Sequence, residues 1–474
     1  MTLSNSDNNF PVRPGQAIAM LVAGVAMLLV GLSVMHLNAR IVLALDGALM
    51  CLMACCFGMK WDVLQKGIKD MISSMLVAML ILLAVGMLIA SWMAAGTIPV
   101  MIYYGMQVIT PSIFLPVVCI LCSLMSALAG TSWGTLATLG VACMGVAEGL
   151  GVPAEAAAGA VCVGAFVGDK LSPLSDSTVI TATVTDTTLM DGIRHALVST
   201  GPAYLISIAF FFIYGLTLDT HAATGAAYDE ILATLRTSFD LSPLALLPVP
   251  LVIALIMWKK PTLPTFGAGI AAGAVLAVLL QGIDITHVCT YLYSGFKTDT
   301  GSSFVNQMLN RGGFTSMLST IGLLMAAAVF GAPLRSAGVA DVLLAMLRRA
   351  ARSSRSMSFL VLCLHALFFT ITGAYYVSYP VIGTMTKDMF PEYGLEKKNL
   401  MRMMLDTGTG LAPLVPWSTT GSYTASTLGV TNLAFLPFAP MLWLSIVFSV
   451  IYALTGICTA KLRSNRPQTT QVVA

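Results

Sequence analysis

Charged residues are scarce in this chain. Only 9% of its 474 residues are Asp, Glu, Lys or Arg, and none of them lies between Asp70 and Glu148. A soluble domain carries about 25% charged residues, so this composition excludes a soluble globular protein. Apolar residues make up 57% of the chain. Several windows hold about 20 mostly apolar residues, enough to cross a bilayer. We therefore predict an all-α polytopic membrane protein.

Several chemical motifs are also missing. The chain has no nucleotide-binding P-loop, no HExxH zinc motif, and no recognisable nucleophile with its base, so neither an ATP-driven pump nor an intramembrane enzyme is favoured. We expect no nucleic-acid partner and no cofactor. The ten cysteines lie mostly in apolar stretches, and Cys119 and Cys122 have no second pair nearby, so they read as packing residues. The polar start, with Arg13 alone as a basic residue, predicts no cleavable signal peptide.

Two halves of similar plan follow one another. We predict a cytoplasmic tail (1–14), a first transmembrane repeat (15–218), an extracytoplasmic linker (219–242), a second repeat (243–460) and a cytoplasmic tail (461–474). Three pairs of segments match in order: Ala95-Gly96 with Ala337-Gly338, Gly130 with Gly373, and Pro173-Leu174 with Pro413-Leu414. Each half holds two apolar arms joined by a glycine, and then a broken helix. Paired, interrupted apolar segments indicate a transport site.

The distribution of basic residues tests the topology. If the paired arms are re-entrant hairpins, each half has five crossings and the second repeat is inverted relative to the first. With the N-terminus inside, 19 basic residues then lie on the cytoplasmic side and four outside, which fits the positive-inside rule. Full crossings would move Arg194 and the cluster between Lys387 and Arg402 outside, so we favour hairpins. The amphipathic segment 339–352 predicts a helix lying on the membrane surface.

One polar run interrupts an apolar stretch of the first half. It reads Gly-Asp-Lys-Leu-Ser-Pro-Leu-Ser-Asp-Ser-Thr over residues 168–178. Ionisable groups at membrane depth are expensive and indicate function, and proline breaks the helix. Carboxylates, hydroxyls and freed carbonyls are oxygen ligands for a small cation. We therefore predict an ion site that includes Asp169, Lys170, Ser172, Ser175, Asp176, Ser177 and Thr178.

This run resembles the signature of the NhaC-type sodium/proton antiporters of the ion transporter superfamily. The segments 406–409 and 413–417 (Asp-Thr-Gly-Thr and Pro-Leu-Val-Pro-Trp) resemble a second motif of that family, and 130–135 (Gly-Thr-Ser-Trp-Gly-Thr) a third. The resemblance implies exchange of sodium for protons. Relatives exchange organic solutes such as malate and lactate, and some carry amino acids. The family usually has an acidic pair where this chain has Leu405-Asp406, so one carboxylate is absent.

The carboxylates allow more than one role. Asp176 could hold sodium or a proton in turn, or cap the half-helix after the break. Lys170 could neutralise Asp169 or Asp176, carry a proton itself, or form a structural ion pair with Asp169. Asp406 is the counterpart in the second half, and it could instead pair with Arg402 one turn earlier. We predict sodium contact at Asp176 and Asp406.

Hydroxyl groups complete the predicted site. Those of the first hairpin tip are Thr131 and Ser132, and those of the second half are Thr407, Thr409, Ser418 and Thr419. The second tip carries Tyr375 and Tyr376, which are compatible with an organic substrate but could also be packing residues. Asp46 is a lone carboxylate in the second apolar stretch.

Two functions remain open at this level. The first is a sodium/proton antiporter; the second is a sodium- or proton-coupled transporter of a small organic anion or amino acid. Either would be a multi-pass protein of the bacterial inner membrane, with both termini in the cytoplasm and the lipid bilayer as its surroundings. We expect the hairpin-bearing part to move against a scaffold. On analogy with the resembling family we also expect a homodimer.

Overall fold

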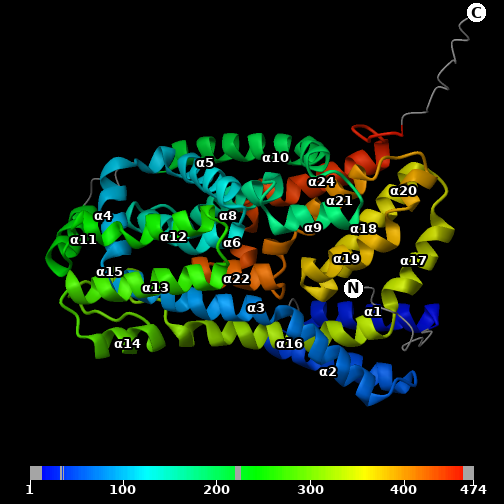
Figure 1. Cartoon of the computed structure of the whole chain (residues 1–474), viewed down its shortest axis with the longest axis horizontal. Helices are drawn as coiled ribbons and strands as arrows, with labels where there is room; N and C mark the ends of the chain where they lie inside the picture. Colours follow the sequence, from blue (N-terminus) through cyan, green and yellow to red (C-terminus); the bar gives the residue numbers. More distant parts are fainter. Residues whose placement is uncertain (1–12, 32–34, 36, 219–225, 463–474) are drawn as a thin grey trace, which may run out of the picture.

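A computed structural model describes residues 13–31, 35, 37–218 and 226–462. In these ranges the chain is helical, and the only strand-like pairing is an isolated bridge between Leu395 and Lys461. Most long helices run along the long axis of the molecule (Figure 1). The predicted tails lie almost entirely outside the described residues, as do residues 219–225 of the predicted linker.

The first half contains ten α-helices and one π-helical turn. Their bounds are α1 Pro14–Leu29, α2 Ala39–Cys56, α3 Trp61–Ala94, α4 Thr97–Val108, α5 Pro111–Ala129, α6 Ser132–Thr135, the π turn Leu136–Gly140, α7 Val141–Gly149, α8 Ala154–Leu171, α9 Asp176–Val184 and α10 Leu189–Thr217.

The linker and the second half contain fourteen α-helices. Their bounds are α11 Ala226–Ser238, α12 Pro248–Met257, α13 Thr262–Leu279, α14 Ile285–Ser294, α15 Ser303–Leu309, α16 Leu318–Ser336, α17 Val339–Ala350, α18 Ser354–Thr372, α19 Tyr375–Thr386, α20 Met389–Glu392, α21 Lys398–Thr407, α22 Thr419–Leu428, α23 Asn432–Phe435 and α24 Pro440–Thr455.

The described residues confirm the polytopic helical class. Six helices are long and apolar enough to cross a membrane, and up to nine spans result if each sharply bent pair counts as one. One bent pair is α8 with α9, which meet at 43° across the polar run. The predicted break in that span is therefore present.

Glycines end equivalent helices in the two halves. Helix α3 is followed by Gly96 and α16 by Gly338, with φ angles of +78° and +67°. The first hairpin turns at Gly130 (φ +67°) and the second at Gly373 (φ +64°). Residues with a Cβ rarely adopt this left-handed conformation. The chain therefore turns in the same way at the two glycine pairs of the sequence match.

Helix α3 and its counterpart α16 run antiparallel. Near the start of α16, the Gly313 amide donates to the Gly86 carbonyl of α3 at 2.6 Å. At the other end, Ser336 of α16 lies against Gly67 of α3. Helix α2 packs on α16, and α13 packs on α3. Each half thus contributes one helix to flank the central helix of the other half.

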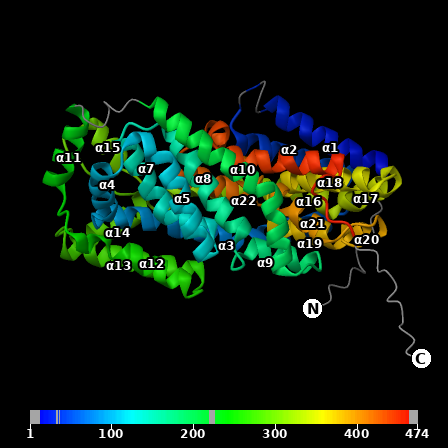
Figure 2. The same ribbon diagram turned by 90° about the horizontal axis from the view of Figure 1, so that it is seen from above.

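Helices α10 and α24 also run antiparallel. The Tyr452 hydroxyl of α24 donates to the Val198 carbonyl of α10 at 3.3 Å. At the far end, the rings of Tyr214 and Phe438 pack edge to face with centroids 5.3 Å apart. The short helices α4 and α17 lie at opposite ends of the molecule (Figure 1), and α1–α2 and α12–α13 lie on opposite sides (Figure 2). An inverted repeat requires this arrangement.

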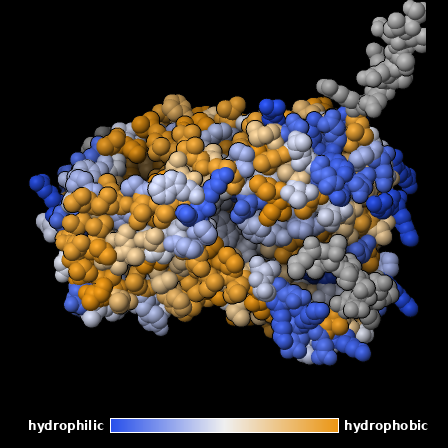
Figure 3. Space-filling model, in the orientation of Figure 1, coloured by the Kyte–Doolittle hydropathy of each residue, from blue (hydrophilic) through white to orange (hydrophobic). Residues whose placement is uncertain are grey.

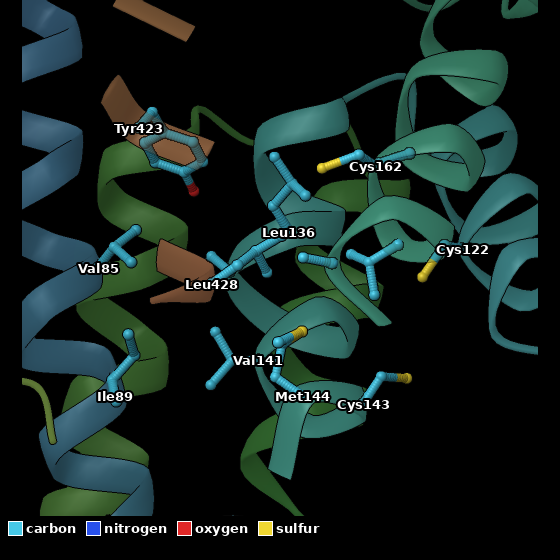
Figure 4. Close-up of a cluster of buried hydrophobic side chains, with 14 of the residues drawn as sticks. Val85, Ile89, Cys122, Leu136, Val141, Cys143, Met144, Cys162, Tyr423 and Leu428 are labelled. Atoms are coloured by element: carbon cyan, nitrogen blue, oxygen red, sulfur yellow. The ribbon is translucent and has the colours of Figure 1, made fainter. Parts of the chain in front are cut away.

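A buried apolar cluster joins the two halves. Val85 and Ile89 of α3 face Leu136 and Val141, which lie in the second arm of the first hairpin. Leu428 of α22 packs between them (Figure 4). Cys122, Cys143 and Cys162 are buried in the same region and carry free thiols. The cysteines there are packing residues, as predicted.

The first hairpin tip depends on a glycine. A Cβ at Gly130 would lie 2.7 Å from the backbone of Leu174 in the polar run. Since φ is also positive, we expect Gly130→Ala to lower the unfolding free energy by about 1–2 kcal/mol or more. Thermal unfolding of the detergent-purified protein measures this. Gly322→Ala in α16, where no atom lies within 4 Å of the new methyl group, is the control; an equal loss in both variants would contradict the prediction.

A surface ion pair connects the two halves next to the break. Asp186, in the turn after α9, accepts from Lys387 at 2.8 Å and Lys397 at 3.0 Å. These lysines lower the pKa of Asp186. A lowered folded-state pKa adds stability that is present above the unfolded pKa of about 3.9 and is lost as the pH falls through the folded value. We therefore expect Asp186→Asn to be less stable than the wild type at neutral pH, with the difference vanishing in acid; a pH-independent difference in melting temperature would contradict this.

Candidate functional site

A cavity of about 410 Å³ lies where the two hairpin tips approach the break between α8 and α9. Its walls come from both halves: the first tip, the second tip, the polar run, α3, and the junction of α12 with α13. The lining residues are Ser74, Val77, Ala78, Ile81, Gly130, Thr131, Ser132, Trp133, Asp169, Asp176, Ser177, Pro261, Thr262, Leu263, Tyr375 and Tyr376. Both hairpin tips therefore end at one cavity.

Asp169 is the buried carboxylate of the cavity. It lies in the last turn of α8 and is 4% exposed. One oxygen accepts from the Ser175 hydroxyl at 2.5 Å and the other from Ser132 of the first tip at 3.1 Å. Thr178 donates to its backbone carbonyl. The two sides of the break and the first hairpin tip are thus held together by this one residue.

Asp176 is the accessible carboxylate. It is the first residue of α9, and Ser175 occupies the N-cap position that the capping alternative gave to Asp176. The Ser175 side chain makes no cap hydrogen bond, since it donates to Asp169 instead. The exposed Asp176 lines the cavity together with the buried Ser177. Asp176 is therefore placed to meet an incoming solute.

The lining is rich in oxygen and carries negative charge only. Asp169 and Asp176 are its ionisable carboxylates, and no Lys, Arg or His is among the lining residues. Hydroxyls come from Thr131 and Ser132 of the first tip and from Tyr375 of the second. A cavity lined by one sign of charge attracts the opposite sign. Carboxylate and hydroxyl oxygens suit a hard cation, so the arrangement can hold a small cation or a proton.

Lys170 points away from this cavity, although it follows Asp169 directly. Its ammonium lies 2.5 Å from an Asp406 oxygen, and both side chains are fully buried. Lys170 also donates to Ser445 at 3.2 Å. Neither of the predicted partners of Lys170, Asp169 or Asp176, pairs with it. The ion pair instead connects the broken helix of one half to that of the other.

Asp406 is fully engaged in this pair. Its second oxygen accepts from Ser199 of α10 and Ser449 of α24, each at 2.7 Å. The alternative partner Arg402 instead donates to the Cys458 carbonyl at 3.0 Å. Asp406 is not among the cavity residues, so in this conformation the predicted sodium pair of Asp176 and Asp406 is divided between two environments. Asp169 takes the place beside Asp176.

The remaining predicted hydroxyls make structural contacts, four of them in the second half and one in the first. Thr407 contacts buried His365 at 2.6 Å, and Thr409 contacts Tyr379 at 2.7 Å. Ser418 caps α22 by accepting from the Gly421 amide. The Thr419 hydroxyl donates to the Gly373 carbonyl at the second tip, and the Ser172 hydroxyl donates to the Ala127 carbonyl of α5. None of these five residues lines the cavity.

Neither Leu405 nor Asp46 lines the cavity. Leu405, where the resembling family has an acid, is buried with Ala182, Ala196 and Met401 and does not reach the cavity. Asp46 is buried, and neither of its oxygens has a partner among the described residues.

Sequence reasoning missed the serines of α24 that contact the buried ion pair: Ser445 accepts from Lys170, and Ser449 donates to Asp406. Ser445 and Ser449 are four residues apart, a spacing that places both on one face of an apolar helix, and this was an available signal. The stacking of Trp133 on Tyr423, with centroids 4.3 Å apart, had no such signal.

Comparison with known proteins identifies relatives over most of the chain. The sequence profile of the Na⁺/H⁺ antiporter family matches residues 3–186 and 164–457. The malate-2H⁺/Na⁺-lactate antiporter of Bacillus subtilis is 37% identical, covering 84% of this chain and 85% of the relative. The Na⁺/H⁺ antiporter NhaC of Alkalihalophilus pseudofirmus is 35% identical (85% and 87%), and the arginine/ornithine antiporter ArcD of Halobacterium salinarum is 34% identical (93% and 92%).

The buried ion pair makes a clear prediction. Removing one partner leaves a buried charge uncompensated, so Lys170→Met and Asp406→Asn should each lower stability by about 3–5 kcal/mol. The double variant should lose much less than the sum of the two. Thermal unfolding of all three proteins measures the coupling, and Lys69→Met at an exposed position of α3 is the control. Additive losses would show that the two residues do not depend on each other.

Proposed function

The chain belongs to the Na⁺/H⁺ antiporter family, and from that premise we propose that it exchanges sodium for protons at the cavity between the two hairpin tips. The supporting observation is the lining itself: Asp169 and Asp176 face a cavity that contains hydroxyl oxygens and no basic side chain.

The exchange follows from competition for the same oxygens. A carboxylate that coordinates sodium cannot at the same time carry a proton on the coordinating oxygen. Asp176 is exposed and meets the ion first, whereas Asp169 is buried and supplies the second negative charge. Ser132 and Ser175 already contact Asp169, so their oxygens lie next to any ion bound there. Loading from one side and release on the other gives antiport.

The proposal extends to the arrangement in the membrane. We assign the protein to the bacterial cytoplasmic membrane as two inverted repeats, 15–218 and 243–460, separated by the extracytoplasmic linker 219–242. Hydrophilic residues gather at the end that carries α17, α18 and α20 (Figures 1 and 3). By the positive-inside rule this basic end faces the cytoplasm, with the tails 1–14 and 461–474. A homodimer remains a prediction from the resemblance alone.

A second function has its own support. The cavity volume of about 410 Å³ lies within the range of organic-ligand pockets and far exceeds the space that one bare sodium ion fills. Tyr375 and Tyr376 supply an aromatic wall, with ring centroids 4.4 Å apart. Two relatives are named for lactate, malate, arginine and ornithine. The alternative is thus coupling of the cation site to a small organic anion or amino acid.

The experiment is transport by the purified protein in proteoliposomes with an imposed sodium gradient. We expect sodium-driven proton movement, reduced about tenfold or more by Asp169→Asn or Asp176→Asn, because each removes a charged ligand. Glu155→Gln, at the other end of α8 and away from the cavity, is the control. Wild-type rates in both aspartate variants would exclude the cavity as the site.

The same vesicles separate the two functions. Sodium-driven proton movement without any organic solute supports sodium/proton exchange. Proton or sodium movement that requires lactate, malate or a basic amino acid supports the alternative, and Tyr376→Ala should then weaken solute dependence while leaving the protein folded.

A further inference from the structure

A second, smaller cavity lies at the basic end, apart from the proposed transport site. Its volume is about 130 Å³, and it lies between the start of α18, the end of α24 and the segment before α21. The lining residues are Ser354, Arg355, Ser358, Leu395, Ala453, Gly456, Thr459 and Lys461. None of them lines the transport cavity. By volume it would hold a group about the size of four waters.

The lining carries positive charge only. Arg355 and Lys461 contribute two cations and no carboxylate lines the cavity. Among the described residues, neither cation lies within salt-bridge distance of a carboxylate. Glu396, next to the lining residue Leu395, is held by Lys398 at 2.5 Å. Residues 463–474 contain no Asp or Glu. Within the part of the chain that the structure describes, the two cations therefore lack a counter-charge.

A buried hydroxyl also lacks a partner. Ser358 is 2% exposed, lines the cavity, and its oxygen has no hydrogen-bond partner among the described residues. A buried polar group without a partner is costly. Ser358 lies one turn along α18 from Ser354, so its hydroxyl and the N-terminal end of a 19-residue helix face the same space. Helix N-termini favour anions, because their first amides have no helical partner.

The backbone makes room for the guanidinium. Gly456 ends α24 with φ +77°, and a Cβ there would approach Arg355 Nε to 3.2 Å. Because Gly456 has no Cβ, Arg355 can lie close against the end of α24. Two cations, several hydroxyls and a helix N-terminus together supply the many donors that a tetrahedral oxyanion accepts.

We propose that this cavity binds a phosphate group, carried by an anionic lipid or by a soluble phosphate. The neighbouring α17 is amphipathic and packs on α18, so the cavity is near the level where lipid headgroups lie. A phosphate there links α18, the first arm of the second hairpin, to α24 and to the segment before α21. Occupancy thus ties the arm that carries the tyrosine tip to its neighbours, whichever solute the transport cavity accepts.

The test uses the full chain in detergent and two probes: inorganic phosphate, and mixed micelles containing phosphatidylglycerol, with diacylglycerol as the phosphate-free lipid. Binding is followed by the shift in melting temperature and by native mass spectrometry. We expect Arg355→Gln and Lys461→Gln each to weaken binding about fivefold. Ser358→Ala should weaken it measurably while changing only one atom of the core. Arg349→Gln, an equal charge change on α17 outside the cavity, should leave binding unchanged.

The outcomes are distinct. Binding of inorganic phosphate alone assigns a soluble phosphate, and binding of phosphatidylglycerol alone assigns a lipid. Binding that Arg349→Gln weakens as much as Arg355→Gln would reduce the effect to general surface charge and overturn the proposal. The proposal would also be overturned if neither probe bound, or if the Ser358→Ala and Lys461→Gln variants both bound the probe as tightly as the wild type. Since these residues do not line the transport cavity, sodium/proton exchange in the same variants reports separately on the proposed function.

Discussion

The buried ion pair between Lys170 and Asp406 is the contact on which the arrangement of the two halves depends. It joins the end of one broken helix to the end of the other, and both side chains are fully buried. Two charges so far from water are tolerated only with good geometry and additional hydrogen bonds. Ser199, Ser445 and Ser449 supply those bonds. Helices α8, α10, α21 and α24 are therefore held in one register around a single point.

The cavity between the two hairpin tips is a consequence of this placement. Successive residues on a helix point about 100° apart, so when Lys170 turns toward Asp406, Asp169 turns toward the first hairpin tip. The Lys170 ammonium is thereby kept away from the cavity. The two carboxylates of the cavity, Asp169 and Asp176, are left without a basic neighbour in its lining. The break at residues 172–175 then brings Asp176 to the same space. A motif of alternating charges in the sequence becomes two separate electrostatic environments in the fold.

Local features could be read from the sequence, and distant pairings could not. Gly130 and Gly373 are visible as helix breaks because glycine is the residue that adopts positive φ freely, and the structure has both turns. The polar run stood out because its side chains are costly in hydrocarbon. The partner of Lys170, however, lies 236 residues away, and a nearer candidate at Asp169 had equal chemical merit.

The cavity wall formed by residues 261–263 was not predicted, because Pro-Thr-Leu after two lysines is an ordinary loop sequence between two apolar stretches. The duplication of the two halves could be inferred from matching breaks, whereas the contacts of Ser199, Ser445 and Ser449 with the ion pair depend on how the helices pack. Sequence reasoning thus found the residues that bend the chain and carry charge, but not the neighbours that decide which charge faces which.

The pairing of Lys170 with Asp406 also has an electrical consequence. Moving one elementary charge across a membrane at 100 mV involves about 2.3 kcal/mol, but a matched cation and anion that travel together do no net work in that field. The pair therefore adds nothing to the voltage dependence of a conformational change that carries both residues. Any current through this protein would report the contents of the cavity and its two carboxylates, and the ratio of ions exchanged could be read directly from the reversal potential.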